Sequence, residues 1–233
     1  MIYSVLEVYM EYKKNLKYFE NKKLMLYGSA ALLALGLFLW FGPFWSRDNH
    51  YVMYIISVIS IIAGGVIFAV TVSSRSSDKK IDEQIDAAFR HFEEESLERF
   101  DLYERQLSYV NSVSFEGYEY KPDSLIRRDR SGKYRSDTYA KNHVYFTQEE
   151  IVIASSSISL IRDEKTDRSV AIPYGDIRLA SVRDCEIKYG KVTIRYQIFS
   201  VETNGGRTYE YQTSASSEID TLVADVNHQK QRH

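Results

Sequence analysis

The sequence predicts an α+β membrane protein: an antiparallel two-helix transmembrane hairpin, a long juxtamembrane helix, and a curved antiparallel β-sheet or barrel closed by a C-terminal helix. Two long segments near the N-terminus are apolar and contain no Asp, Glu, Lys, Arg or His, whereas apolar residues after position 110 recur with the period of two that is typical of strands. These observations divide the chain into a cytoplasmic amphipathic helix at 1–23, the hairpin at 24–72, a polar joint and helix at 73–109, a cytoplasmic β domain at 110–228 and a tail at 229–233.

The two predicted spans are residues 24–45 and 51–72. A helix of about 22 residues, rising ~1.5 Å per residue, matches the ~30 Å hydrocarbon core of a bilayer. A cleaved signal peptide has a shorter apolar region of about 7–15 residues that ends in small residues. The first segment instead ends in Phe44 and Trp45, which favours a retained membrane anchor.

Charges flanking the spans predict that both termini lie in the cytoplasm. Only residues 46–50 connect the two helices, and this loop carries Arg47 as its one Lys or Arg. Basic residues concentrate outside the hairpin, and the positive-inside rule places such residues in the cytoplasm. Those before the first span are Lys13, Lys14, Lys17, Lys22 and Lys23, and those after the second are Arg75, Lys79 and Lys80. The lysines serve either as ordinary topogenic charge or as contacts to anionic lipid.

Small residues in the spans, including Gly28, Gly64 and Gly65, are candidates for close helix packing. These glycines would serve packing of the two spans on each other. Alternatively, they would serve oligomerisation or line a conduit. Neither span contains Asp, Glu, Lys, Arg or His, which disfavours an ion or proton pathway.

Two amphipathic helices are predicted on either side of the hairpin. Apolar residues from Val5 to Phe19 recur every three or four positions before the first span. After the second span, residues 79–109 have an apolar stripe whose register shifts near Ser96, which predicts one long helix. This helix would pack on the β domain or on a second copy of the chain.

The C-terminal region predicts at least six short antiparallel strands and one closing helix. The helix begins at Ser216 or Ser217, and Asn204-Gly205-Gly206 joins the last two strands as a hairpin turn. The predicted strands are residues 113–120, 143–146, 150–154, 157–161, 170–172, 177–182, 192–201 and 207–213.

The order of elements resembles a bacterial pleckstrin-homology-like (PH-like) or GRAM-like domain over about residues 113–227. The resemblance rests on Tyr145 to Ile153, then Ala171 to Ile177, then a long strand, a glycine-containing turn, an aromatic strand and a short helix. It implies a noncatalytic module that binds lipid headgroups or proteins. The chain departs from that family in an extra basic stretch before Thr147, so phosphoinositide binding does not simply carry over.

That basic stretch is the most distinctive local feature of the β domain. Five cations within nine residues are candidates for binding an anionic headgroup, a phosphate or a nucleotide. They are Arg127, Arg128, Arg130, Lys133 and Arg135. A solvated loop is the alternative, and tethering near the inner leaflet would raise the effective concentration of lipid around it.

Composition excludes several classes of function. A net charge of -2 disfavours nucleic-acid binding, and the single Cys185, with no nearby His, is expected to be a small core or turn residue. The five histidines are dispersed, so no metal site and no cofactor are expected. No catalytic motif is present in the sequence, and no enzyme activity is predicted.

Three functions remain open from the sequence alone. The first is a membrane-anchored adaptor in the bacterial inner membrane whose β domain binds a protein partner or an anionic lipid. The second is a ligand-triggered effector that oligomerises through its hairpin and disrupts the membrane. The third is an auxiliary subunit of a transporter or envelope complex. Membrane lipids, together with a protein partner or a second copy of the chain, are the expected partners.

Overall fold

The computed structural model describes residues 11–20, 23–41, 50–73, 76–102, 112–214 and 217–232. The chain separates into two compact units. One comprises Lys13–Ser77, and the other comprises Met1–Tyr12 together with Asp78–His233.

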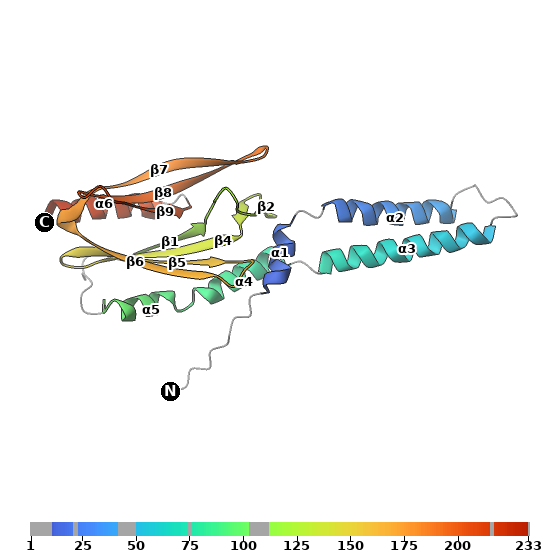
Figure 1. The fold of residues 1–233 in the computed structure, drawn as a ribbon, viewed down its shortest axis with the longest axis horizontal. Coiled ribbons are helices and arrows are strands. Elements are labelled where there is room, and N and C mark those ends of the chain that lie inside the picture. The colour runs from blue at the N-terminus through green and yellow to red at the C-terminus, as the bar shows by residue number, and fades with distance from the viewer. Residues whose placement is uncertain are drawn as a thin grey trace, which may run out of the picture. The chain divides into compact units, whose positions relative to one another are not determined.

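The helical unit is built on two apolar helices, α2 (Lys23–Phe41) and α3 (His50–Ser73), which lie side by side (Figure 1). A short helix, α1 (Tyr12–Phe19), precedes them. Among the described residues, Tyr51–Thr71 in α3 forms the one helix that is long and apolar enough to cross a membrane, and the apolar helix Met25–Phe41 is shorter. The end of the first predicted span, residues 42–45, lies outside the described residues.

The second unit is a mixed α+β structure with antiparallel sheets, as the sequence predicts. A four-stranded sheet has the order β1-β4-β5-β6, a three-stranded sheet has the order β7-β8-β9, and β2 and β3 form a separate hairpin. The strands are β1 (Val113–Tyr118), β2 (Ile126–Arg128), β3 (Tyr134–Ser136), β4 (Thr138–Phe146), β5 (Glu150–Ser159), β6 (Lys165–Pro173), β7 (Ile177–Tyr189), β8 (Val192–Thr203) and β9 (Thr208–Thr213). A 3-10 turn, η1 (Tyr174–Asp176), joins β6 to β7.

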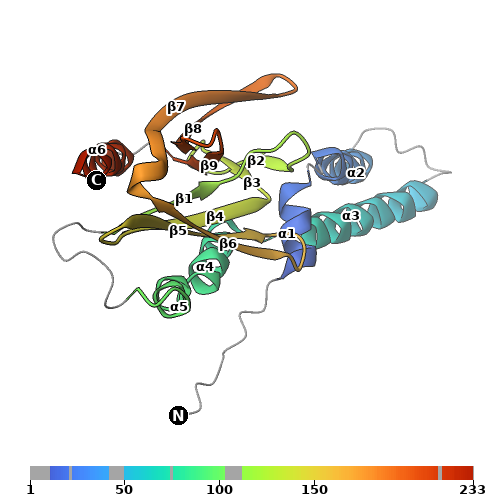
Figure 2. The same cartoon turned by 60° about the vertical axis from the view of Figure 1, so that its left-hand side comes forward.

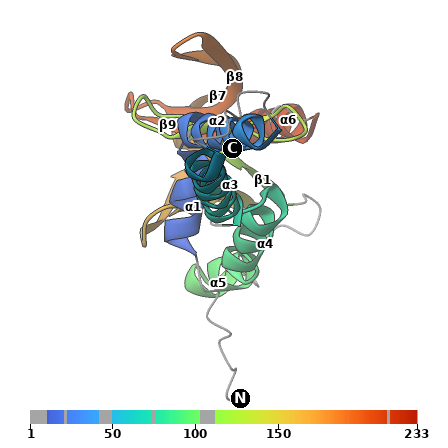
Figure 3. The ribbon, with the colours of Figure 1, turned by 90° about the vertical axis from the view of Figure 1, so that its right-hand side faces the viewer.

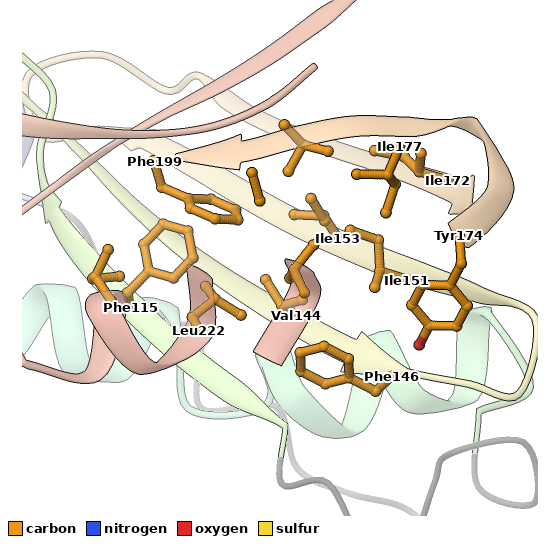
Figure 4. Packing of buried hydrophobic residues seen from close by; sticks show 14 residues of the cluster. Phe115, Val144, Phe146, Ile151, Ile153, Ile172, Tyr174, Ile177, Phe199 and Leu222 are labelled. Carbon is orange, nitrogen blue, oxygen red and sulfur yellow. The ribbon is translucent and has the colours of Figure 1, made fainter. Parts of the chain in front are cut away.

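The core lies between the two larger sheets and is covered at one end by α6 (Ser217–Arg232) (Figure 4). Alternation along β4 and β5 turns Val144, Phe146, Ile151 and Ile153 to this core. Ile219, Leu222 and Val226 recur at helical spacing and bury one face of α6 against it. Phe115 and Phe199 meet across the sheets with ring centroids 5.7 Å apart.

Two short helices lie on the opposite face of the four-stranded sheet, away from β7, β8 and β9 (Figures 2 and 3). They are α4 (Asp78–Ala88) and α5 (Phe92–Arg99). Phe89, at the break between them, packs against Tyr139 of β4 with centroids 6.0 Å apart, and Phe92 is also buried. The single long helix predicted for 79–109 is therefore wrong within its described part, because a turn at Phe89 lets both helices keep their apolar sides on the sheet.

Other expectations also need correction. The sheets do not close into a barrel. The two predicted strands 150–154 and 157–161 form one strand, β5, because serines at 155 and 156 continue its pairing with β4. Cys185 lies in the middle of β7 and is half-buried, in neither a core nor a turn position. Its strand is longer than predicted because pairing with β8 continues to Tyr189.

The free edge of β7 is capped where α6 crosses it. The Asn227 side chain accepts a hydrogen bond from the backbone N–H of Ala180 at 3.1 Å and donates one to the Ala180 carbonyl at 2.9 Å. Lys230 donates to the carbonyl of Arg178. Such contacts satisfy main-chain groups that an edge strand otherwise leaves open.

Candidate functional site

The basic stretch forms a β-hairpin, β2–β3, where a solvated loop was the alternative. Its turn is fixed by Asp129, whose carboxylate accepts hydrogen bonds from the Ser131 hydroxyl at 2.7 Å and the Lys133 backbone N–H at 2.9 Å. Gly132 has a φ of +90°, a conformation that favours glycine. Asp at the first position and Gly at the fourth are the residues that such a turn prefers.

Arg135 on β3 is enclosed by acidic and aromatic groups, and only 12% of its side chain is exposed. Its guanidinium donates to Asp129 at 3.0 Å and to both oxygens of Asp82 on α4, the longer of these two bonds measuring 3.2 Å. It also donates to the Tyr118 hydroxyl at 3.1 Å. This arginine is therefore already neutralised within the fold.

The electrostatics of this cluster favour the ionised arginine and carboxylate. Burial opposes the charge of Asp129, but hydrogen bonds from Ser131, Arg135 and the Lys133 backbone outweigh it and lower the pKa of the carboxyl group. Burial also opposes the charge of Arg135, yet the bond to Asp82 and the other partners raise its pKa. Burial raises the pKa of Tyr118, so this phenol stays protonated beside the guanidinium.

The other four predicted cations occupy different environments on the same hairpin. Arg130 and Lys133 are exposed and have no ion-pair partner among the described residues. Arg128 is exposed, donates from Nε to the Gly132 carbonyl at 2.9 Å and lies with its guanidinium carbon 5.9 Å from the centre of the Tyr134 ring. Arg127 is half-buried. The hairpin thus brings the five residues together but leaves Arg128, Arg130 and Lys133 as its accessible positive charges.

The hairpin is fastened to the start of α4 at two points. The Arg130 backbone N–H donates to Asp78 at 3.1 Å, and Arg135 forms its ion pair with Asp82 one turn further along the helix. Neither aspartate was predicted from the sequence to belong to the site. The available signal was their spacing, because acidic residues at i and i+4 share one face of a helix.

The predicted membrane-surface lysines lie at the beginning of the helical unit. Lys13 and Lys14 are exposed on α1 and Lys17 is half-buried, while Lys23 is the first residue of α2. Lys22 lies outside the described residues. On the inner side of α1, Asn15 accepts a hydrogen bond from the Ser76 hydroxyl at 2.6 Å, so the segments before α2 and after α3 are joined.

The predicted packing glycines divide into two groups. A Cβ at Gly64 would lie 3.0 Å from the Leu33 backbone nitrogen, so α2 and α3 approach each other at this point. Among the described residues, no atom outside the glycine's own stretch of helix lies within 4 Å of such a Cβ at Gly28 or Gly65, so these two glycines do not lie at this contact. Gly36, which was not among the predicted packing residues, does lie there, and a Cβ at this position would be only 2.6 Å from Ile61 Cγ1.

Depressions on the described part of the second unit include a small polar one and a larger groove. The small one, of about 210 Å³, lies beside the β5–β6 turn and is lined by residues such as Asp137, Ser157 and Arg162. The groove, of about 1260 Å³, lies between β2–β3 and the β7–β8 strands and is lined by five tyrosines. These are Tyr118, Tyr120, Tyr134, Tyr139 and Tyr196.

Within the described residues, no group of three His, Cys, Asp or Glu side chains could hold a metal ion. His143 on β4 is 4% exposed, and neither of its ring nitrogens has a hydrogen-bond partner among the residues that the structure describes. Its ring stacks on Tyr145 at 4.5 Å. Comparison of the chain with protein-family models, curated proteins and solved structures found no match.

Proposed function

We propose that this chain is a noncatalytic membrane-anchored adaptor whose β unit contacts anionic lipid headgroups through the β2–β3 hairpin. The observation that carries the membrane part is the exposure of large apolar side chains around α3. Tyr51, Ile62 and Val70 are 78%, 61% and 59% exposed, and Phe41 of α2 is 79% exposed. Helices that are apolar all round require a nonpolar environment, and a bilayer provides one.

In this proposal α2 and α3 are the two spans of a hairpin, and both termini lie on the cytoplasmic side of a bacterial inner membrane. The lysines before α2 and after α3 support this orientation, because the connecting residues 46–50 carry only Arg47 as a Lys or Arg. The β unit would then be held in the cytoplasm.

The order of strands in the β unit supports a PH-like module. Four antiparallel strands are followed by three more, and a C-terminal helix packs on the core between the two sheets. The β2–β3 hairpin is an insertion between the first two strands of this series. A module of this kind binds headgroups or proteins and needs no catalytic group.

The geometry of the hairpin determines which of its cations are accessible to a lipid headgroup. Arg135 is neutralised by Asp82 and Asp129, so its role is to hold the hairpin on α4. Arg128, Arg130 and Lys133 would contact phosphate. Asp78, which binds the Arg130 backbone, follows Ser73 at the end of α3 by only five positions, so a short segment of chain would tether the hairpin to the proposed membrane anchor.

Lipid retention in nanodiscs tests this function. The full chain is reconstituted with mixed phosphatidylcholine and phosphatidylglycerol, and lipids that remain bound after transfer to detergent are counted by native mass spectrometry. We expect enrichment of phosphatidylglycerol that is lost in Arg130→Glu/Lys133→Glu. The matched control, Lys188→Glu/Lys191→Glu, reverses two exposed lysines on the β7–β8 hairpin and should retain it. Equal retention by both variants would refute the headgroup site.

A further inference from the structure

The strands β7 and β8 continue beyond β9 as a two-stranded arm (Figure 2). β9 pairs only with Gln197–Glu202 of β8, whereas residues 192–196 of β8 pair only with β7. Alternate residues of a strand direct their N–H and C=O groups to opposite edges. Within the part of the chain that the structure describes, no strand and no other main-chain group bonds to the second edge of 192–196.

β9 stops because the chain meets β1 at this point. The Ser214 hydroxyl donates to the Glu116 carbonyl at 3.0 Å, and a Cβ at Gly117 would lie 3.3 Å from the Ser214 nitrogen. This contact leaves no room for β9 to continue in line. The space beside residues 192–196 of β8 is therefore left without a strand.

The 1260 Å³ groove occupies this space. Its lining includes Thr193 to Gln197 of β8, Thr213 and Ser214 at the end of β9, and Gly117 and Tyr118 at the end of β1. Tyrosines on the other walls offer flat apolar rings with a polar tip, which bind peptide side chains at little cost in conformational entropy. An open strand edge beside aromatic pockets is suited to strand addition by an extended peptide.

Charges in the groove indicate which peptide would fit. Asp184 accepts a hydrogen bond from Gln197 at 3.0 Å, and Glu186 lies 3.6 Å from Arg195. These carboxylates are already paired. The Lys133 ammonium has no ion-pair partner among the described residues, so an acidic side chain of the ligand is favoured there.

We propose that the groove binds an extended, acidic peptide segment of a partner protein, which pairs as an added strand beside residues 192–196 of β8. The peptide places a carboxylate near Lys133 and alternate apolar or aromatic side chains among the tyrosines. This inference rests on the proposed adaptor function and names the chemistry of the partner. Lys133 takes part in both proposals, whereas Arg128 and Arg130 of the headgroup site do not line the groove, and Thr193 and Arg195 of the groove do not belong to the headgroup site.

The test uses the full chain in detergent and a phage-displayed library of random peptides. Thr193→Trp fills the groove at an exposed position, and Lys188→Trp is its matched control, since Lys188 is the exposed cross-strand neighbour of Thr193 and lies outside the groove. We expect the parent chain and Lys188→Trp to select peptides rich in Asp or Glu and apolar residues. Thr193→Trp should bind them at least about tenfold more weakly, and Lys133→Glu should abolish the acidic preference.

Hydrogen exchange then locates the bound peptide. The proposal requires slower exchange of backbone amides within residues 192–196 when a selected synthetic peptide is added, with Lys188→Trp behaving like the parent chain. The proposal is overturned if the parent chain selects no peptides that bind it more tightly than they bind Thr193→Trp. Selection of proline-rich peptides that do not protect these amides overturns strand addition, and dissociation of a dimer by Thr193→Trp identifies a second copy as the occupant instead. Thr193→Trp leaves Arg128, Arg130 and Lys133 unchanged, so loss of peptide binding in this variant does not bear on the headgroup site, and the two proposals fail separately.

Discussion

At the scale of single residues, Arg135 shows how a cation in a basic stretch can have a structural role. Five residues of one charge type within nine positions indicate an anion site. Arg135, however, joins β3 to Asp82 of α4 and closes the turn through Asp129, whose side chain is 5% exposed. Removing one partner of such a cluster leaves the other charge buried without compensation.

Arg135→Ala is expected to destabilise the β unit by about 3 kcal/mol, because Asp129 would lose its main charged partner. Arg130→Ala should change the free energy of unfolding by less than about 0.5 kcal/mol, since that side chain is exposed. Thermal unfolding of the full chain in detergent, followed by near-ultraviolet circular dichroism of the tyrosines, measures both. Equal melting temperatures for the two variants would contradict the structural role.

His143 is a second residue whose environment sets a measurable property. Burial lowers the pKa of its imidazole and the nearby Lys141 acts in the same direction, while Glu93 on α5 opposes both. The folded state therefore binds a proton less readily than the unfolded state. Stability is consequently lost as the pH falls through about 6.5, the ordinary histidine value.

We expect the melting temperature of the β unit to fall between about pH 7.5 and about pH 5.5, and His143→Phe to remove much of that fall. Phenylalanine keeps the stacking on Tyr145 but cannot be protonated. His91→Gln alters an exposed histidine and serves as the control. An unchanged pH dependence in His143→Phe would mean that another group controls it.

At the scale of elements, the contact between α2 and α3 depends on which glycines face the neighbouring helix. A methyl group at Gly36 or Gly64 would lie within 3.0 Å of atoms on the opposite helix, including backbone nitrogen atoms. Gly28 and Gly65 have open space at the same position. The chain therefore contains two contact glycines and two internal controls of the same residue type.

Gly36→Ala and Gly64→Ala should force the helices apart and lower the thermal stability of the helical unit, by about 1–3 kcal/mol as for other overpacked contacts. Gly28→Ala and Gly65→Ala should leave stability unchanged or raise it by up to about 1 kcal/mol, since alanine favours helix more than glycine does. Far-ultraviolet circular dichroism during heating in detergent distinguishes the pairs. Similar behaviour of all four variants would argue against this helix contact.

At the scale of the whole molecule, the lone thiol of Cys185 reports the proposed topology. It is half-buried on β7, in the unit that we propose to lie in the cytoplasm. A membrane-impermeant maleimide should therefore label it only after spheroplasts are permeabilised. Asn49→Cys in a Cys185→Ser chain places the thiol between the two proposed spans in the sequence, and the proposed topology requires that it be labelled in intact spheroplasts. Labelling of Cys185 in intact spheroplasts would show that the β unit lies on the opposite side of the membrane from the one proposed.

Much of the element order could be predicted because it depends on local periodicity. The alternation in 192–201 predicts β8, and Ile219, Leu222 and Val226 predict the buried face of α6. Boundaries that depend on partners were less predictable. The break at Phe89, the hairpin at Ile126 to Ser136 and the length of β7 are decided by what each segment packs against or pairs with.

The two apolar helices, the antiparallel β unit, the closing helix and the concentration of basic residues at 127–135 can all be read from the sequence. Each follows from chemistry within a few neighbouring positions. Three features emerge only in the folded chain: Arg135 is neutralised by Asp82, Gly36 and Gly64 lie at the helix contact, and β8 extends past β9 beside a tyrosine-lined groove. The physical reason is that ion pairing, close packing and open strand edges depend on residues far apart in the chain, which become neighbours only when it folds.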